Sequence, residues 1–135
     1  MKYIKSDAGR SKAFPEAKKN EGDCVIRAIV HATQLSYKEI WNEMFAIALE
    51  TGNFPNSEEV SVEYLKRKGW TQTKLPRKPL IRINSTKLPQ TDDWIICHIR
   101  HHWVAKKGNA IYDIWDCRKN SYGDYHRVFR YYTKN

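Results

Sequence analysis

Residues 102–116 read HWVAKKGNAIYDIWD, and this stretch predicts a β-hairpin. Apolar and aromatic residues dominate both halves, as is typical of strands. Between the halves stands Gly108-Asn109, a pair that suits the tight turn joining two antiparallel strands. The second half of the chain is therefore expected to form an antiparallel sheet.

The register of this hairpin decides which carboxylate faces the histidine. If Gly108-Asn109 is the whole loop, His102 lies opposite Trp115, and Asp113 lies diagonally beside His102 on the same face. A loop longer by one residue, or a bulge, would reverse this parity and bring Asp116 to His102 instead. Either carboxylate would hold the imidazole in one tautomer, which is how a general base is oriented.

A cysteine opens the first predicted helix, in the stretch Gly22–Ala28 that reads GDCVIRA. Asp23 is a favourable N-cap residue, so we expect Cys24 in the first helical turn. The unpaired N–H groups and the positive end of the helix dipole favour a thiolate there and can stabilise an oxyanion. The Asp23 carboxylate opposes thiolate formation, so a histidinium partner would have to outweigh it.

The remaining pattern predicts one α+β domain, with helices first and an antiparallel sheet after. We expect a strand and a polar loop over 1–22, and helices beginning at Asp23, at the Ser36 capping box and near Ser57. Apolar residues on the second of these helices predict its buried face: Ile40, Trp41, Met44, Phe45, Ala48 and Leu49. Strands are expected near 70–74, 80–84, 94–99, 102–106, 110–115 and 127–133.

Composition narrows the classes of function. The chain has 135 residues, a formal net charge of +9 and three cysteines, too few and too widely spaced for a disulfide framework. No Cys pair has the spacing of a zinc site, and His98 and His102, which are four apart, are expected on different strands, so we expect no metal and no cofactor. Without an apolar leader or membrane span, we expect a cytoplasmic protein that does not bind membranes, as a monomer or an oligomer of unknown size.

Several short motifs together resemble a known superfamily. They are Gly22–Ala28, Leu88-Pro89, the predicted strand at 94–99, His102–Ala105 and Tyr112–Asp116. In this order they resemble a group of small, mostly uncharacterised phage and bacterial proteins that look like compact papain-like cysteine peptidases. The resemblance covers roughly residues 20–133 and implies a single papain-like domain over 1–135, with the nucleophilic cysteine at a helix N-terminus.

The resemblance assigns roles to individual residues. It implies that Cys24 is the nucleophile, His102 the general base, and Asp113 or Asp116 the orienting acid. Bacteriocin-processing leader peptidases, which look like more distant relatives, place their acid at an Asp-Pro after the second strand, and Asp116-Cys117 matches that place. Papain-like enzymes carry a Gln before the cysteine as an oxyanion donor, whereas this chain offers only Asn20, at a different spacing.

The predicted function is a cysteine peptidase or a related thiol acyl hydrolase, such as an isopeptidase or deamidase, acting through an acyl-enzyme on a protein or peptide. If the chain is phage-encoded, as the resemblance implies, it would act on a target in the host cytoplasm. The alternative is a non-catalytic module on the same fold that binds a protein or a nucleic acid. The net charge and a C-terminal run of aromatic and basic residues favour that alternative. His98 and His101 are candidates to replace His102, His31 is expected at the surface, and Cys97 in the core.

Overall fold

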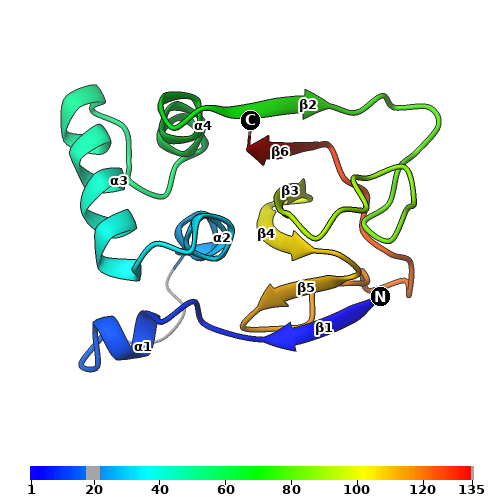
Figure 1. The fold of residues 1–135 in the computed structure, drawn as a ribbon, viewed down its shortest axis with the longest axis horizontal. Coiled ribbons are helices and arrows are strands. Elements are labelled where there is room, and N and C mark those ends of the chain that lie inside the picture. Colours follow the sequence, from blue (N-terminus) through cyan, green and yellow to red (C-terminus); the bar gives the residue numbers. More distant parts are fainter. Residues whose placement is uncertain (18–21, 135) are drawn as a thin grey trace.

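The computed structural model describes residues 1–17 and 22–134. The helices in these residues are α1 (Arg10–Ala13), α2 (Cys24–Thr33), α3 (Tyr37–Thr51) and α4 (Glu58–Arg67). The strands are β1 (Lys2–Lys5), β2 (Trp70–Lys74), β3 (Trp94–Ile99), β4 (His102–Lys107), β5 (Ala110–Asp113) and β6 (Arg130–Lys134). The predicted α+β class is confirmed (Figure 1).

The six strands form one mixed sheet in the order β1-β5-β4-β3-β6-β2. β2, β3, β4, β5 and β6 pair antiparallel with one another, as expected. β6 follows β5 in the chain yet lies between β3 and β2, so β2 reaches the sheet only through β6.

β1 corrects the prediction of a purely antiparallel sheet, because it pairs with β5 in parallel. Lys5 lies opposite Asp113, and the Ser6 N–H extends the ladder by donating to the Asp113 carbonyl at 2.8 Å. The direction of β1 follows from where the chain goes next. β1 ends at the same end of the sheet as β5, and α2 begins near that end.

Local signals explain where the helices begin and end. The Ser36 hydroxyl accepts a hydrogen bond from the Glu39 N–H at 3.1 Å, and Ser57 accepts one from the Val60 N–H at 3.3 Å. Gly52 ends α3 in the left-handed conformation, at φ 77°, which glycine adopts at no steric cost. The predicted starts of α3 and α4 are therefore confirmed.

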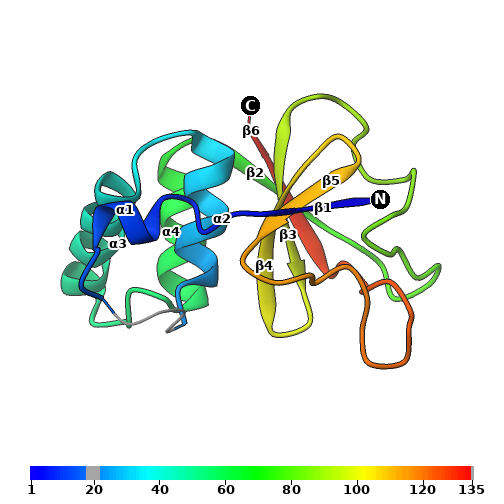
Figure 2. The ribbon, with the colours of Figure 1, turned by 90° about the horizontal axis from the view of Figure 1, so that it is seen from below.

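The helices gather on one side of the sheet, with α2 against its central strands (Figure 2). Two cores result. The first lies between helices and sheet and includes Ile29, Ile40 and Ile96. The second lies on the opposite face of the sheet. There the segment that precedes β3 and the segment that follows β5 in the chain cover residues such as Val104 and Ile111.

Three local predictions were wrong. The segment 7–22, predicted as loop, contains the single turn of α1. Residues 80–84 form no strand of the sheet. Their main chain makes two hydrogen bonds to 126–128 and an isolated bridge from Arg82 to Arg127, and they cannot extend further because Pro79 lacks an N–H and a turn follows at Ser85.

The predicted buried face of α3 was also partly wrong. Ile40, Met44 and Ala48 are buried, but Leu49 is 88 % exposed and Phe45 is 42 % exposed. α3 is the outer helix in Figure 2, so only a narrow stripe of it faces α2 and α4. None of the described helices is long and apolar enough to cross a membrane.

A pair of truncations on α3 tests this burial. Ile40 is fully buried and Leu49 is exposed, so Ile40→Ala should lower the free energy of unfolding by about 2–5 kcal/mol. Leu49→Ala should change it by less than about 0.5 kcal/mol. Urea denaturation measures both, and equal losses would contradict the arrangement of α3.

Candidate active site

His102 and Asp113 meet where the hairpin opens. β4 and β5 pair Lys107 with Ala110, as a two-residue loop requires. His102 begins β4 and Asp113 ends β5, so antiparallel pairing puts both at one end of the sheet. The His102 Nε2 lies 2.5 Å from the Asp113 Oδ2, and the His102 ring packs on Trp115 with 5.0 Å between centroids. The register predicted from the turn is confirmed.

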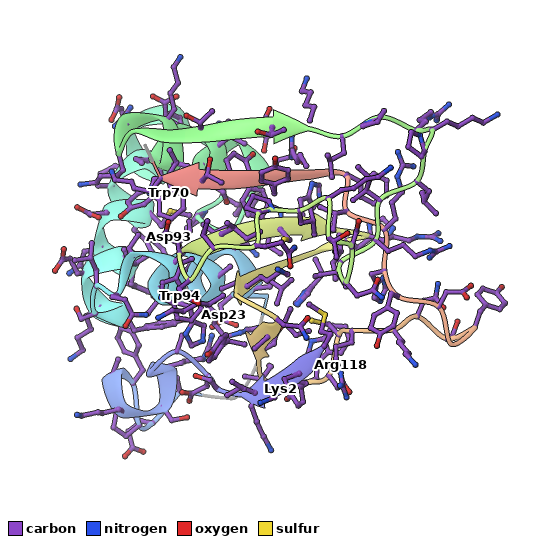
Figure 3. The ribbon with its side chains drawn as sticks, turned by 45° about the vertical axis from the view of Figure 1, so that its right-hand side comes forward. Lys2, Asp23, Trp70, Asp93, Trp94 and Arg118 are labelled. Carbon is purple, nitrogen blue, oxygen red and sulfur yellow. The ribbon has the colours of Figure 1, made fainter. Side chains whose placement is uncertain are left out.

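Asp116 does not take part in this arrangement. Its carboxylate accepts hydrogen bonds from the Arg118 guanidinium at 2.7 and 2.9 Å, and its side chain is 44 % exposed. Figure 3 shows Arg118 beside β1, where its Nη1 donates to the Met1 carbonyl. Of the two carboxylates that the sequence left open, the structure brings Asp113 to His102.

Cys24 reaches the same end of the sheet from the helical layer. It is the first residue of α2 and is half-buried. Burial alone would raise the pKa of its thiol, but hydrogen bonds from His102 and from the Trp103 N–H outweigh burial and lower it. Because the His102 Nε2 is engaged with Asp113, Nδ1 is the ring nitrogen left for Cys24.

The backbone just before Cys24 is held by Asn56, in the loop before α4. Gly22 has φ 76°, which favours glycine. Its carbonyl accepts a hydrogen bond from the Asn56 Nδ2 at 3.1 Å, and a Cβ on Gly22 would lie 3.1 Å from the same atom. The backbone at Gly22 is therefore in close contact with a side chain of the loop before α4.

His102 is held in its charged form. Burial alone would lower the pKa of its imidazole, but hydrogen bonds with Asp113, Cys117 and Cys24 raise it to about 11. Burial would raise the pKa of the Asp113 carboxyl, and the hydrogen bond and charge of His102 lower it instead. At neutral pH the site therefore favours an imidazolium between two acidic groups, one a carboxylate and the other a thiol of lowered pKa.

Arg27 joins this site to the start of α2. Its Nη2 lies 3.1 Å from the Asp113 Oδ1, and its Nη1 forms a buried ion pair with Asp23, four residues earlier on the helix. Both carboxylates are buried. One guanidinium therefore bridges the helix and the sheet.

Asp23 is engaged by other groups as well. Its Oδ2 accepts a hydrogen bond from the Tyr37 hydroxyl at 2.7 Å and lies 2.9 Å from the Arg10 guanidinium. Asp23 stands at the N-cap position of α2, as predicted, but its side chain makes no hydrogen bond to the helix backbone. Because two guanidinium groups neutralise Asp23, its charge opposes the Cys24 thiolate less than the sequence suggested. Figure 3 shows Asp23 between the helices and the strands.

The sequence did not assign Cys117 and Arg27 to the site. The buried Cys117 thiol lies 3.5 Å from the Asp113 Oδ2 and interacts with His102. Burial raises the pKa of this thiol, so it remains a hydrogen-bond donor to Asp113. Nothing in the local pattern predicts this contact. Arg27 had a signal: it is a single cation in an apolar helical run, four residues after Asp23.

The atoms of His102, Asp113 and Cys117 that can bind metals lie within 4.8 Å of one another. Three such ligands could hold a zinc ion that kept one open position. The Arg27 guanidinium beside Asp113 opposes a divalent cation there. The donor set fits the hydrogen-bonded pair better than a metal.

The other candidates lie elsewhere. His98 packs between Trp103 and Phe129, and His101 is exposed in the turn before β4. His31 is partly buried and stacks on Trp94. Cys97 is fully buried in the second core, as predicted. Asn20 lies outside the described residues, so its oxyanion role stays a prediction.

No protein-family model, curated protein or solved structure matches this chain. The resemblance to papain-like peptidases therefore stays a prediction.

The pairing of Cys24 with His102 predicts an unusual pH dependence of alkylation. In the native protein Cys24 should react with iodoacetamide well below pH 8, because a thiol of lowered pKa is ionised there. In His102→Ala the Cys24 pKa should rise, because only the Trp103 N–H and the more weakly acting charge of Arg27 then oppose burial. The rate at pH 6.5 should then fall on the order of 100-fold, because only about 1 in 100 molecules of an ordinary cysteine is ionised at that pH.

His101→Asn is the matched control, since His101 is exposed at φ 54° and Asn tolerates that conformation. Mass spectrometry of each cysteine reads out the rates, with buried Cys97 and Cys117 as internal references. Equal rates in the two variants would show that His102 does not activate Cys24.

The bridging role of Arg27 predicts a large loss of stability. Arg27→Met leaves Asp23 and Asp113 buried without their shared cation, which should lower the free energy of unfolding by about 3 kcal/mol. Arg67→Met is the matched control, because Arg67 also pairs with two carboxylates, Glu50 and Glu63, but in the open. Its loss should be much smaller. Denaturant titration compares the two, and equal losses would contradict the bridge.

Proposed function

We propose that this protein is a cysteine hydrolase that cleaves amide bonds in a protein or peptide, with Cys24 as nucleophile, His102 as acid and base, and Asp113 as the orienting carboxylate. One observation supports the proposal above all: the His102 ring contacts the Asp113 carboxylate and the Cys24 thiol at a helix N-terminus. The motifs that resemble papain-like peptidases support the same assignment.

The first step needs a thiolate. The Cys24 sulfur attacks the carbonyl carbon of the amide, a C–S bond forms, and the carbonyl π electrons move to oxygen. N–H groups in the first turn of α2, which have no partner within the helix, can stabilise this oxyanion.

His102 supplies and then takes a proton. When the tetrahedral intermediate collapses, the C–N bond breaks and the His102 imidazolium protonates the departing amine. The neutral ring next takes a proton from water, the hydroxide oxygen attacks the thioester, and the C–S bond breaks. The products are an amine, a carboxylic acid and the original thiolate–imidazolium pair.

Asp113 and Arg27 support this chemistry without touching the reacting carbon. Asp113 fixes the His102 ring through Nε2, so that Nδ1 faces Cys24. The hydrogen bond from Arg27 holds Asp113 in place from the other side, and the Ile114 N–H donates to the same oxygen at 2.7 Å. Asp113 and Arg27 are therefore positioning residues.

The second candidate is a binding module without catalysis. The observation in its favour is the exposed aromatic and basic surface around Trp115 and Tyr122, which are 46 % and 89 % exposed. The run of residues 122–134 contributes less than its composition suggests, because Val128 and Tyr132 are buried. Retention on a ligand that does not depend on Cys24 would favour this candidate.

Substitution of the two aspartates tests the proposed mechanism. The substrate is the peptide aminomethylcoumarin that the native protein cleaves fastest among a set of such peptides. Cys24→Ala should abolish its turnover. Asp113→Asn should lower kcat by about 10⁴, because the wrong His102 tautomer is then favoured. Asp116→Asn, the matched control, should stay within about twofold, since exposed surface changes have little effect.

Circular dichroism melts of each variant serve as the control that the fold is retained. Full activity in Cys24→Ala, or equal losses in the two Asp→Asn variants, would overturn the mechanism.

A further inference from the structure

A basic cavity adjoins the proposed active site. It has a volume of about 570 Å³ and lies against Trp115, whose ring packs on His102. Arg100, two residues before His102, lines it as well. Trp115 therefore contacts both the cavity and the His102 ring.

The charge of this cavity is one-sided. Its cationic lining consists of Arg82, Arg100, Lys119 and Arg127, with His126 beside them. No carboxylate lines it, and none of the four cations forms an ion pair within residues 1–17 and 22–134.

Neutral contacts hold two of these cations in place. The Arg127 guanidinium lies over the Phe129 ring at 4.5 Å, and the Lys119 ammonium over Tyr125 at 5.0 Å. Such contacts orient a cation but leave its charge uncompensated. His126 lies close enough to the site for burial and the charge of His102 to lower its pKa.

We propose that this cavity binds an acidic side chain of a polypeptide substrate, next to the amide bond that Cys24 attacks. The inference rests on the proposed function and names its substrate class. A carboxylate would find several guanidinium and ammonium donors there, and the Trp115 ring would exclude water from one side of the contact.

The surroundings favour a local anionic group over a long polyanion. Asp124 is exposed and stands two residues after Tyr122, which lines the cavity, so its carboxylate would repel a phosphate backbone that continued past this residue. The four cationic residues line a single open cavity, whereas a single-stranded nucleic acid is bound by a groove that follows its backbone. An acidic peptide meets both conditions, because its charges can be confined to one or two side chains.

Peptide binding to the Cys24→Ala protein tests the inference without requiring catalysis. The probe is a fluorescein-labelled peptide of alternating Glu and Ala, compared with the peptide of equal length that has Gln for Glu. Fluorescence anisotropy should show tighter binding of the Glu peptide. Arg100→Gln/Lys119→Gln should weaken it about fivefold, the sum of two modest exposed charge contacts. Lys12→Gln/Lys66→Gln removes the same charge from exposed positions on α1 and α4 and should change it less than twofold.

Equal binding of the two peptides, or equal losses in the two double variants, would overturn the inference. So would tighter binding of fluorescein-labelled oligothymidylate that falls with Arg100→Gln/Lys119→Gln, since the cavity would then serve nucleic acid. Alkylation of Cys24 in the native protein separates the two proposals. If Cys24 is reactive but no Glu peptide binds, only the cavity assignment fails, whereas an unreactive Cys24 overturns the proposed function even if the peptide binds.

Discussion

The buried ion pair between Arg27 and two carboxylates is the constraint on which the arrangement of this protein depends. Charges are expensive to bury unless each has a partner, and here one guanidinium serves both Asp23 on the helical side and Asp113 on the sheet. The bridge fixes how far α2 lies from β5 and how it is rotated. Cys24 stands between Asp23 and Arg27 in the chain, so its place relative to His102 follows from the same bridge.

The bridge also decides which groups contact each oxygen of Asp113. Arg27 and the Ile114 N–H bind one oxygen of Asp113, and His102 and Cys117 contact the other. The carboxylate thus has partners on both oxygens and holds its charge despite burial. A fixed negative charge behind the imidazole raises the His102 pKa, and the imidazolium in turn lowers that of Cys24. Two thiols border the same histidine, but only Cys24 is open to solvent.

Features that depend on neighbours in the chain were predictable from the sequence. The Gly108-Asn109 turn fixed the register that selects Asp113, and Ser36 and Ser57 marked helix starts. Features that depend on distant partners were not. The parallel pairing of β1 with β5 joins segments about a hundred residues apart. The contact of Cys117 with Asp113 spans only four residues, but it lies in the irregular segment after β5, where no periodicity predicts which side chains meet. The N-cap position of Asp23 was predictable because capping is a local rule, whereas the partners of its side chain, Arg10 and Tyr37, come from other elements.

The position of β6 within the sheet has a consequence for the order of folding. Because β6 lies between β3 and β2, β2 has no neighbour in the sheet until residues 130–134 have been synthesised. During translation the helices and the β3–β4–β5 meander can assemble from nearby segments. Until β6 is available, the backbone N–H and C=O groups on the outer edge of β3 remain unpaired. Such late, non-local strand pairing slows folding and exposes an edge to other chains. The nascent chain is thus prone to aggregate until β6 has emerged from the ribosome and paired with β3 and β2.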